Sequence, residues 1–261
     1  MNKIILDDVK VVDSVVDDCI SYNLIDNEDV KVLNIDVLES CDLDLDYRFS
    51  SAKVEVCINV CSNIILNVNE IISGESAKVR TKYVIDEFSF VNVCKFNNID
   101  SIKEYFVCNL NGVGASINYN LKTISINPEN YEFLVYHNFK NTNSNICTNG
   151  VSIKDGSILF NVSSFIGKNI TGCVATQDNK IINLNDNECI IKPNLYIDCD
   201  DVSATHSAWV GSFREDELFY LQSRGISMDD AIRLLISGFL TSNISDSLCD
   251  YIKNILDMYW R

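Results

Sequence analysis

The feature that most constrains this chain is a succession of short β-patterned segments between about residue 46 and residue 200, with little helical sequence between them. Val54, Val56 and Ile58 alternate with polar residues or cysteine, which is the two-residue period of a half-buried strand. Aromatic and β-branched residues recur in the same way in the later segments, as far as Ile181–Leu184. The pattern predicts a mainly β fold.

The connections between these segments are rich in Asn, Asp, Ser and Gly, which tolerate the backbone angles of turns. A sandwich, a barrel and a β-solenoid all fit short strands with frequent turns. Hairpins favour Asn-Gly or Asp-Gly corners, whereas corners such as 141–145 contain no glycine. This difference favours a β-helix, whose stacked polar corners tolerate Asn, although no exact repeat period is visible.

The sequence after the β-patterned region is helical in character. Glu215–Arg224 has a helical pattern that Gly225 ends, and Ser227 is suited to cap a second helix with an acidic first turn. A third helix is expected over residues 245–259. This order, a long β-region followed by helices, indicates segregated α and β elements rather than alternating βαβ units.

These changes along the chain divide it into three parts. We expect a variable N-terminal segment (1–45), a β-helix core (46–212) and a C-terminal helical module (213–261). Within the first part, Val11–Ile20 fits either a short helix or a strand.

The composition limits the environment and the partners of the chain. A hydrophobic fraction of 47% is sufficient for a sizeable core, and a net charge of −16 opposes sustained contact with nucleic acid or an anionic membrane. The start of the chain lacks the apolar region of a signal peptide, and no stretch of about 18 apolar residues could span a membrane. We therefore expect a cytoplasmic location, with the 11 cysteines present as free thiols.

Specific motifs occur where the β-region meets the helices. The segment 193–202 (PNLYIDCDDV) precedes 203–211 (SATHSAWVG), which is similar to a motif of the form S-H-G-A-T-V-G. Residues 216–227 (DELFYLQSRGIS) are almost identical to D-E-x-L-F-Y-L-x-S-R-G-I, and 231–240 (AIRLLISGFL) continue as A-x-x-L-L-I-x-G-F-x. These motifs resemble the SufB/SufD core family of the SUF iron–sulfur cluster assembly system, with fainter similarity back to residue 157.

This resemblance implies a mainly β fold, a right-handed parallel β-helix with a small C-terminal helical module. In the family, that module binds the SufC ATPase. SufD and SufB pair through their β-helices, and the cluster is thought to form near their interface. Longer members also carry an N-terminal helical domain. We expect this chain to be too short to contain a full-size domain of that kind.

His206 stands where SufD proteins have a functionally important histidine at the subunit interface. An imidazole can bind iron or transfer protons near neutral pH, and the alternative is a structural histidine. Ser207 and Trp209 replace the Gly and Thr of the SufD motif. Ser207 also stands where the SufB branch has a glutamate, and Asp178 falls near the place of a SufB cysteine. We therefore interpret the chain as SufD-like.

The resemblance makes the first C-terminal helix the candidate ATPase contact. Its candidate residues are Leu218, Phe219, Tyr220, Leu221 and Arg224. The alternative for the apolar residues is a role in the helix core, which we favour for Phe219. For Arg224 the alternative is stabilisation of the helix C-terminus.

The cysteines are weaker candidates. Cys57 and Cys61 would face the same side of a single strand and could bind a metal, but they have no second pair and no neighbouring histidine, so we favour a structural role. Cys173, Cys189 and Cys199 lie in the family-like region and could face a partner, with a buried inert thiol as the default.

The motifs of common enzymes are missing from the sequence, which has no phosphate-binding P-loop, hydrolase elbow or H-E-x-x-H helix. We therefore expect not an enzyme but a scaffold subunit, which pairs with SufB-like and SufC-like subunits and binds neither nucleic acid nor membrane. No cofactor is expected to bind firmly, and an iron–sulfur cluster would be present only transiently at a subunit interface. Two alternatives stay open: a β-helix carbohydrate-active enzyme or binding protein, and a self-pairing SufBD homologue that works without SufB.

Overall fold

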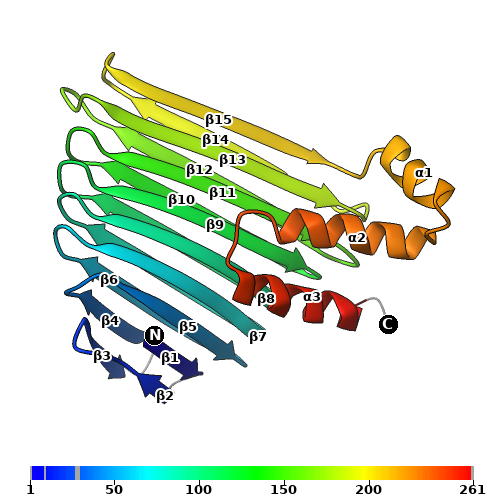
Figure 1. Ribbon diagram of the computed structural model, residues 1–261, viewed down its shortest axis with the longest axis horizontal. Coiled ribbons are helices and arrows are strands. Elements are labelled where there is room, and N and C mark those ends of the chain that lie inside the picture. Colours follow the sequence, from blue (N-terminus) through cyan, green and yellow to red (C-terminus); the bar gives the residue numbers. More distant parts are fainter. Residues whose placement is uncertain (1, 9, 27–29, 260–261) are drawn as a thin grey trace.

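The computed structural model describes residues 2–8, 10–26 and 30–259, which form 15 strands followed by three helices (Figure 1). The strands are β1 (Asn2–Asp7), β2 (Lys10–Val15), β3 (Ile20–Asp26), β4 (Lys31–Val37), β5 (Cys41–Phe49), β6 (Ala52–Val60), β7 (Ile65–Ile85), β8 (Phe90–Leu110), β9 (Ser116–Ser125), β10 (Pro128–His137), β11 (Asn143–Ser152), β12 (Ser157–Ile166), β13 (Cys173–Asn183), β14 (Ile190–Ile197) and β15 (Val202–Gly211). The helices are α1 (Glu215–Ser223), α2 (Met228–Leu240) and α3 (Asp246–Tyr259).

The strands wind into a β-helix of about seven turns. One sheet follows the order β2-β1-β5-β7-β8-β9-β11-β13-β15, and the other runs β3-β4-β6-β7-β8-β10-β12-β14. Every pairing among the described strands is parallel except β1 with β2 and β3 with β4. The expected parallel β-helix with a C-terminal helical module is therefore confirmed.

Strands β7 and β8 belong to both sheets, since each is 21 residues long and passes around a corner of the coil. Gly74 lies at the corner of β7 with a φ of +125°, and a Cβ atom there would lie 1.8 Å from the carbonyl oxygen of Phe49 on the turn below. Only glycine fits this close approach of two stacked corners.

The lumen between the two sheets is the main core of the protein. Side chains from equivalent positions of successive turns stack in rows, as Val68, Val93 and Tyr119 do on β7, β8 and β9. Phe106, from the opposite sheet, packs against Tyr119 with 4.3 Å between the ring centroids. The alternation seen in the sequence therefore separates lumen-facing from outward-facing residues.

Helices α2 and α3 cover the outer face of the first sheet (Figure 1). Phe96 and Ile124 project outward from β8 and β9 into a second hydrophobic cluster with Ile236 and Ile252 of the helices. Ser227 caps α2 as expected, because its hydroxyl accepts a hydrogen bond of 3.2 Å from the backbone N–H of Asp230. No helix among residues 2–8, 10–26 and 30–259 is long and apolar enough to cross a membrane.

The N-terminal segment is part of the coil. The ambiguous stretch Val11–Ile20 contains most of β2 and the first residue of β3, so it is extended rather than helical. The expected boundary at residues 45 and 46 falls inside β5, which pairs in parallel with both β1 and β7. The antiparallel pairs β1–β2 and β3–β4 form this end of the β-helix.

Candidate functional site at the open end of the β-helix

The last turn of the β-helix ends in strands with a free edge. Among the described residues, β14 pairs only with β12 and β15 pairs only with β13. Their outer N–H and C=O groups can pair with another strand. At the opposite end, the edge strands β2 and β3 are short antiparallel strands of 6 and 7 residues, whereas β15 has 10 residues. The C-terminal turn therefore has the longer free edge strands, since β14 has 8 residues and β15 has 10.

The side chains of this last turn are unusually apolar for an exposed surface. Tyr196, Ile197, Trp209 and Val210 have exposed fractions of 54%, 38%, 45% and 41%. Tyr196 is also the last ring of an aromatic column that starts at Tyr136, passes through Phe165, and has centroid separations of 4.8 and 4.7 Å. The column stops at the surface, where its last ring is exposed.

His206 lies in the middle of β15, in register with Gln177 of the turn below. Gln177 is buried in the lumen, where its Nε2 donates to Ser164 Oγ at 2.9 Å and to the Asn194 carbonyl at 3.1 Å, and its Oε1 has no partner among the described residues. His206 thus continues a row of lumen positions but is exposed, because no further turn covers it.

Ser207, next to His206, faces outward and contacts the turn below. Its hydroxyl donates to Asp178 Oδ1, and the other carboxylate oxygen of Asp178 accepts from Lys180 Nζ at 2.8 Å. Burial opposes the ionisation of Asp178, but the hydrogen bonds from Lys180 and Ser207 outweigh it and lower the pKa of that carboxyl. Asp178 is therefore ionised. It lies on the strand next to His206, but its side chain is on the opposite face of the sheet.

The second histidine, His137, is a structural residue. Its ring is 1% exposed, and its two nitrogens lie 2.8 Å from Thr142 Oγ1 and 2.9 Å from Ser144 Oγ. Burial lowers the pKa of His137 to about 4, so it is neutral near pH 7. Of the two histidines, only His206 is accessible to a ligand or partner.

Helix α1 presents the candidate ATPase contacts at the surface. It buries none of its residues completely, and Phe219 and Tyr220 are 71% and 57% exposed. The expectation that Phe219 belongs to the helix core is therefore wrong. Leu218 and Leu221 are half-buried. The guanidinium of Arg224 lies 5.2 Å from the centroid of the Tyr220 ring, so its side chain stacks on this surface.

The cysteines do not form a metal centre in the described part of the chain, which contains no group of three or more His, Cys, Asp or Glu that could hold an ion. Cys57 lies on β6, but that strand ends at Val60 and Cys61 follows it in an exposed position, so the pair does not share one strand. Cys173 is buried and Cys189 and Cys199 are half-buried. All 11 cysteines are free.

A buried ionic network inside the lumen was not predicted from the sequence. Lys95 is completely buried, and its Nζ lies 2.7 Å from Glu70 Oε1 and 2.7 Å from Glu104 Oε1. Glu70 and Lys95 are neighbours in register on the first sheet, whereas Glu104 comes from the opposite sheet. Burial opposes the charge on Lys95, but the two carboxylates outweigh it and raise the pKa of that amine.

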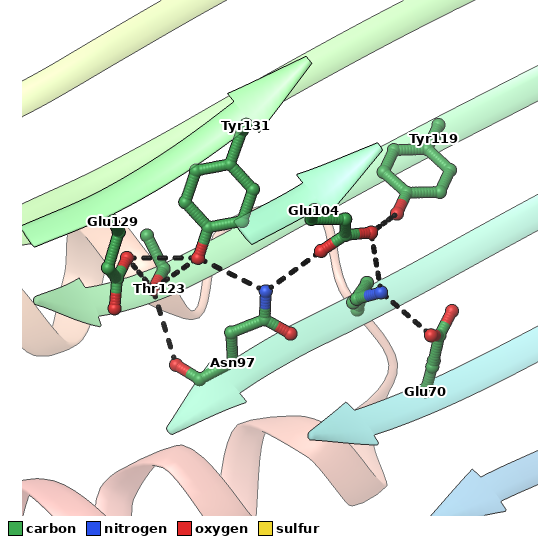
Figure 2. Close-up of polar contacts among 8 residues, drawn as sticks. Glu70, Asn97, Glu104, Tyr119, Thr123, Glu129 and Tyr131 are labelled. Atoms are coloured by element: carbon green, nitrogen blue, oxygen red, sulfur yellow. Dashed lines mark hydrogen bonds and ion pairs between the residues drawn. The ribbon is translucent and has the colours of Figure 1, made fainter. Parts of the chain in front are cut away.

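The network continues through amide and hydroxyl groups (Figure 2). Asn97 Nδ2 donates to Glu104 Oε2 at 3.2 Å and to the Tyr131 hydroxyl at 3.1 Å, and that hydroxyl lies 2.9 Å from Glu129 Oε2. Burial raises the pKa of Glu129 to about 8, so this carboxyl is mostly protonated at pH 7. The alternating strand pattern could have placed these polar residues in the lumen, but it did not show which of them would meet.

The fold defines a parallel β-helix protein with a C-terminal helical module and a free strand edge at its last turn. The sequence profile described as "SUF system FeS cluster assembly, SufBD core domain" matches residues 23–239. The chain therefore belongs to the SufBD family of the SUF iron–sulfur cluster assembly system.

Individual relatives agree with this assignment. The chain is 33% identical over 129 residues to the iron–sulfur cluster assembly protein SufD of Bacillus subtilis, covering 49% of this chain and 30% of that protein. It is 53% identical over 74 residues to the chloroplastic protein ABCI7 of Arabidopsis thaliana, covering 25% and 16%. Identity to SufD of Escherichia coli is 41% over 59 residues, covering 23% and 14%. The matched region thus spans less than a third of each relative.

Replacing Lys95 tests whether the buried network holds the two sheets together. Lys95→Met leaves Glu70 and Glu104 without their cation, and we expect the free energy of unfolding at pH 7 to fall by about 3–5 kcal/mol. Glu70→Gln retains the Lys95–Glu104 pair and should cost only about 1–2 kcal/mol. Urea unfolding measures both. Equal losses for the two variants would show that the ion pairs do not stabilise the fold in this way.

His137 predicts a specific acid sensitivity. Its pKa is about 4 in the folded state and 6.5 when unfolded, so stability is complete above pH 6.5 and falls as the unfolded state gains a proton between pH 6.5 and 4. We expect this residue alone to cost about 2 kcal/mol between pH 7 and pH 5. Urea unfolding of wild type and His137→Gln at both pH values isolates this effect, because the carboxylates are common to both proteins. A pH-dependent loss of the same size in both would contradict it.

Proposed function

We propose that this chain is a SufD-like scaffold subunit of a SUF assembly complex. The observation that carries the proposal is helix α1, whose segment resembles the family motif most closely yet buries none of its residues completely. A motif that does not serve the core of its own chain is well placed to serve a partner. The partner is a SufC-like ATPase, and the contact residues are Leu218, Phe219, Tyr220, Leu221 and Arg224.

Helix α2 supports the same assignment through Gly238. This glycine is exposed in the last turn of α2, and a Cβ atom added to it would meet nothing within 4 Å. Glycine weakens a helix by about 1 kcal/mol relative to alanine, and no packing in this chain requires it. Its place in the family-like segment 231–240 is explained if a partner approaches the helix closely at this point.

The open end of the β-helix is proposed as the site of the second partner. The free edge of β15 and the exposed aromatic column that ends at Tyr196 fit a SufB-like subunit that adds its own strands to the sheet. A second copy of this chain could pair with the same edge, which is the self-pairing alternative. Family membership favours either form of scaffold over a carbohydrate-active protein.

His206 then lies inside the proposed interface. Its imidazole is accessible in the free chain and would be enclosed when a partner covers the last turn. A neutral imidazole can bind iron and a protonated one can donate a hydrogen bond, so the residue suits the handling of a nascent cluster, which is the substrate of such a complex. No resident cofactor is part of the proposal.

The helices provide a route for movement from the ATPase to this interface. Helix α1 contacts α2, and α2 packs on the outer face of β11. Strand β11 pairs with β13, which pairs with β15 and its His206. A displacement of α1 by ATP hydrolysis in the partner would therefore reach the last turn through four successive contacts.

Affinity capture tests the ATPase contact. The tagged chain, incubated with lysate of its native host, should retain an ATPase that mass spectrometry identifies by its phosphate-binding loop. Tyr220→Ala and Arg224→Ala should each reduce the recovery at least fivefold, because they remove an exposed anchor. Gly238→Ala should also reduce it, while raising the free energy of unfolding by about 0.5–1 kcal/mol.

Met258→Ala is the matched control, since Met258 is 67% exposed on α3 outside the family motif and should leave recovery unchanged. Equal recovery with every variant, or an equal loss with Met258→Ala, would refute α1 as the contact. Recovery of the chain with its own untagged copy, rather than with a SufB-like subunit, would favour self-pairing.

A further inference from the structure

Three lysines form a row on the outer face of the second sheet. Lys53 on β6 is in register with Lys78 on β7, which is in register with Lys103 on β8, and all three are exposed. Neighbouring strands lie about 4.8 Å apart, so the row spans about 10 Å. Like charges directly opposite each other in a sheet are destabilising. The row therefore lowers the stability of the folded chain.

Two more cations lie on the same face. Arg80 and Lys82 follow Lys78 along β7 at alternate positions, and both are exposed. The guanidinium of Arg80 lies 4.9 Å from the centroid of the Tyr105 ring and 4.0 Å from Glu55 Oε1. This basic face thus gathers five of the 21 Lys and Arg residues of a chain whose net charge is −16.

The lysines of this face are not neutralised within the protein. Arg80 has Glu55 beside it, but none of Lys53, Lys78, Lys82 and Lys103 has a carboxylate oxygen within 4.0 Å among the residues that the structure describes. Four unpaired cations on adjacent strands raise the local potential and attract anions.

The surface is hollowed over the row. A pocket of about 290 Å³ is lined by Lys53, Lys78, Lys103 and Arg80, and by one carboxylate, that of Glu55. A second pocket of about 260 Å³ adjoins it and shares Lys103 and Tyr105 with the first. Pockets that bind small molecules have volumes of about 300 Å³ or more. The first hollow is close to this lower limit, so it has room for one compact group.

We propose that the basic face of β6, β7 and β8 binds a small anion that carries several phosphate groups. Three cations in one row match a ligand with more than one anionic group, and the length of the row, about 10 Å, fits a compact chain of phosphates. An extended polyanion is disfavoured because Glu55 and Glu132 flank the face on β6 and β10, and the surrounding chain is strongly acidic. This site is independent of the proposed docking surfaces.

Calorimetric titration of the full chain with inorganic tripolyphosphate at low salt tests the proposal. We expect saturable binding, and Lys78→Gln at the centre of the row should weaken it about tenfold, since it removes one charge-assisted hydrogen bond. Lys103→Gln should weaken it similarly, which guards against a local defect in one variant. Lys168→Gln, at an exposed turn without an ion pair among the described residues, should have no effect.

The proposal would be overturned by an absence of saturable binding or by orthophosphate that binds as tightly as tripolyphosphate. An equal loss with Lys168→Gln, or no loss with either Lys78→Gln or Lys103→Gln, would also overturn it. A duplex DNA that binds more tightly than tripolyphosphate, with the same dependence on Lys78 and Lys103, would overturn the small ligand in favour of an extended one. Circular dichroism of each variant confirms that the fold is retained.

Discussion

The structure depends on parallel strands that stack in register, turn upon turn. Each residue lies about 4.8 Å above its counterpart one turn earlier, so a single position in the sequence becomes part of a row that runs through several turns. Lumen rows build the core, and outward rows such as Asn67, Asn92 and Asn118 build the faces. The row of Lys53, Lys78 and Lys103 arises in the same way.

The same stacking creates a problem at each end, because the last strand of a parallel coil always has an unpaired edge. The N-terminal end finishes in the antiparallel pairs β1–β2 and β3–β4, whose outer strands are short. These outer strands expose Val15 and Ile25, whereas the longer strands β14 and β15 at the C-terminal end expose four large apolar residues and His206. This difference between the ends is the basis for proposing a partner at the C-terminal turn.

The lumen is not uniformly apolar, and its polar residues connect the two sheets. The ion pairs of Lys95 join Glu70 on one sheet to Glu104 on the other, without any access to solvent. Buried charges are expensive to desolvate, which offsets much of the attraction within the network, and removing one partner leaves a buried charge uncompensated. Its residues lie at equivalent heights of neighbouring turns, which again follows from the register.

The sequence predicted the strands and helices better than the pairing between them. Alternation identified the strands, and Ser227 and Gly225 marked the helix boundaries, because these signals are local. The repeat was not visible because its length grows from 25 residues between Lys53 and Lys78 to 31 between Asn143 and Val174, and because one row can hold Glu70, Lys95 and Leu121 in turn.

The candidate site was predictable only in part. The motif resemblance located His206 and α1, but it could not show that β15 has a free edge, since pairing is a long-range property. Phe219 was misjudged because an apolar residue within a short helix looks like core until the packing of that helix is known. The contacts of Lys95 and the basic face also depend on turns that are distant in sequence.

We propose that this chain meets its partners through its C-terminal turn and α1. Hydrogen–deuterium exchange of the chain, alone and in a complex reconstituted with the ATPase and SufB-like subunits of its host, tests it most directly. We expect slower exchange over β15 and over residues 215–225 in the complex, with β2 and β3 unchanged. Protection of β2 and β3 instead, or no protection of β15 and α1, would contradict it.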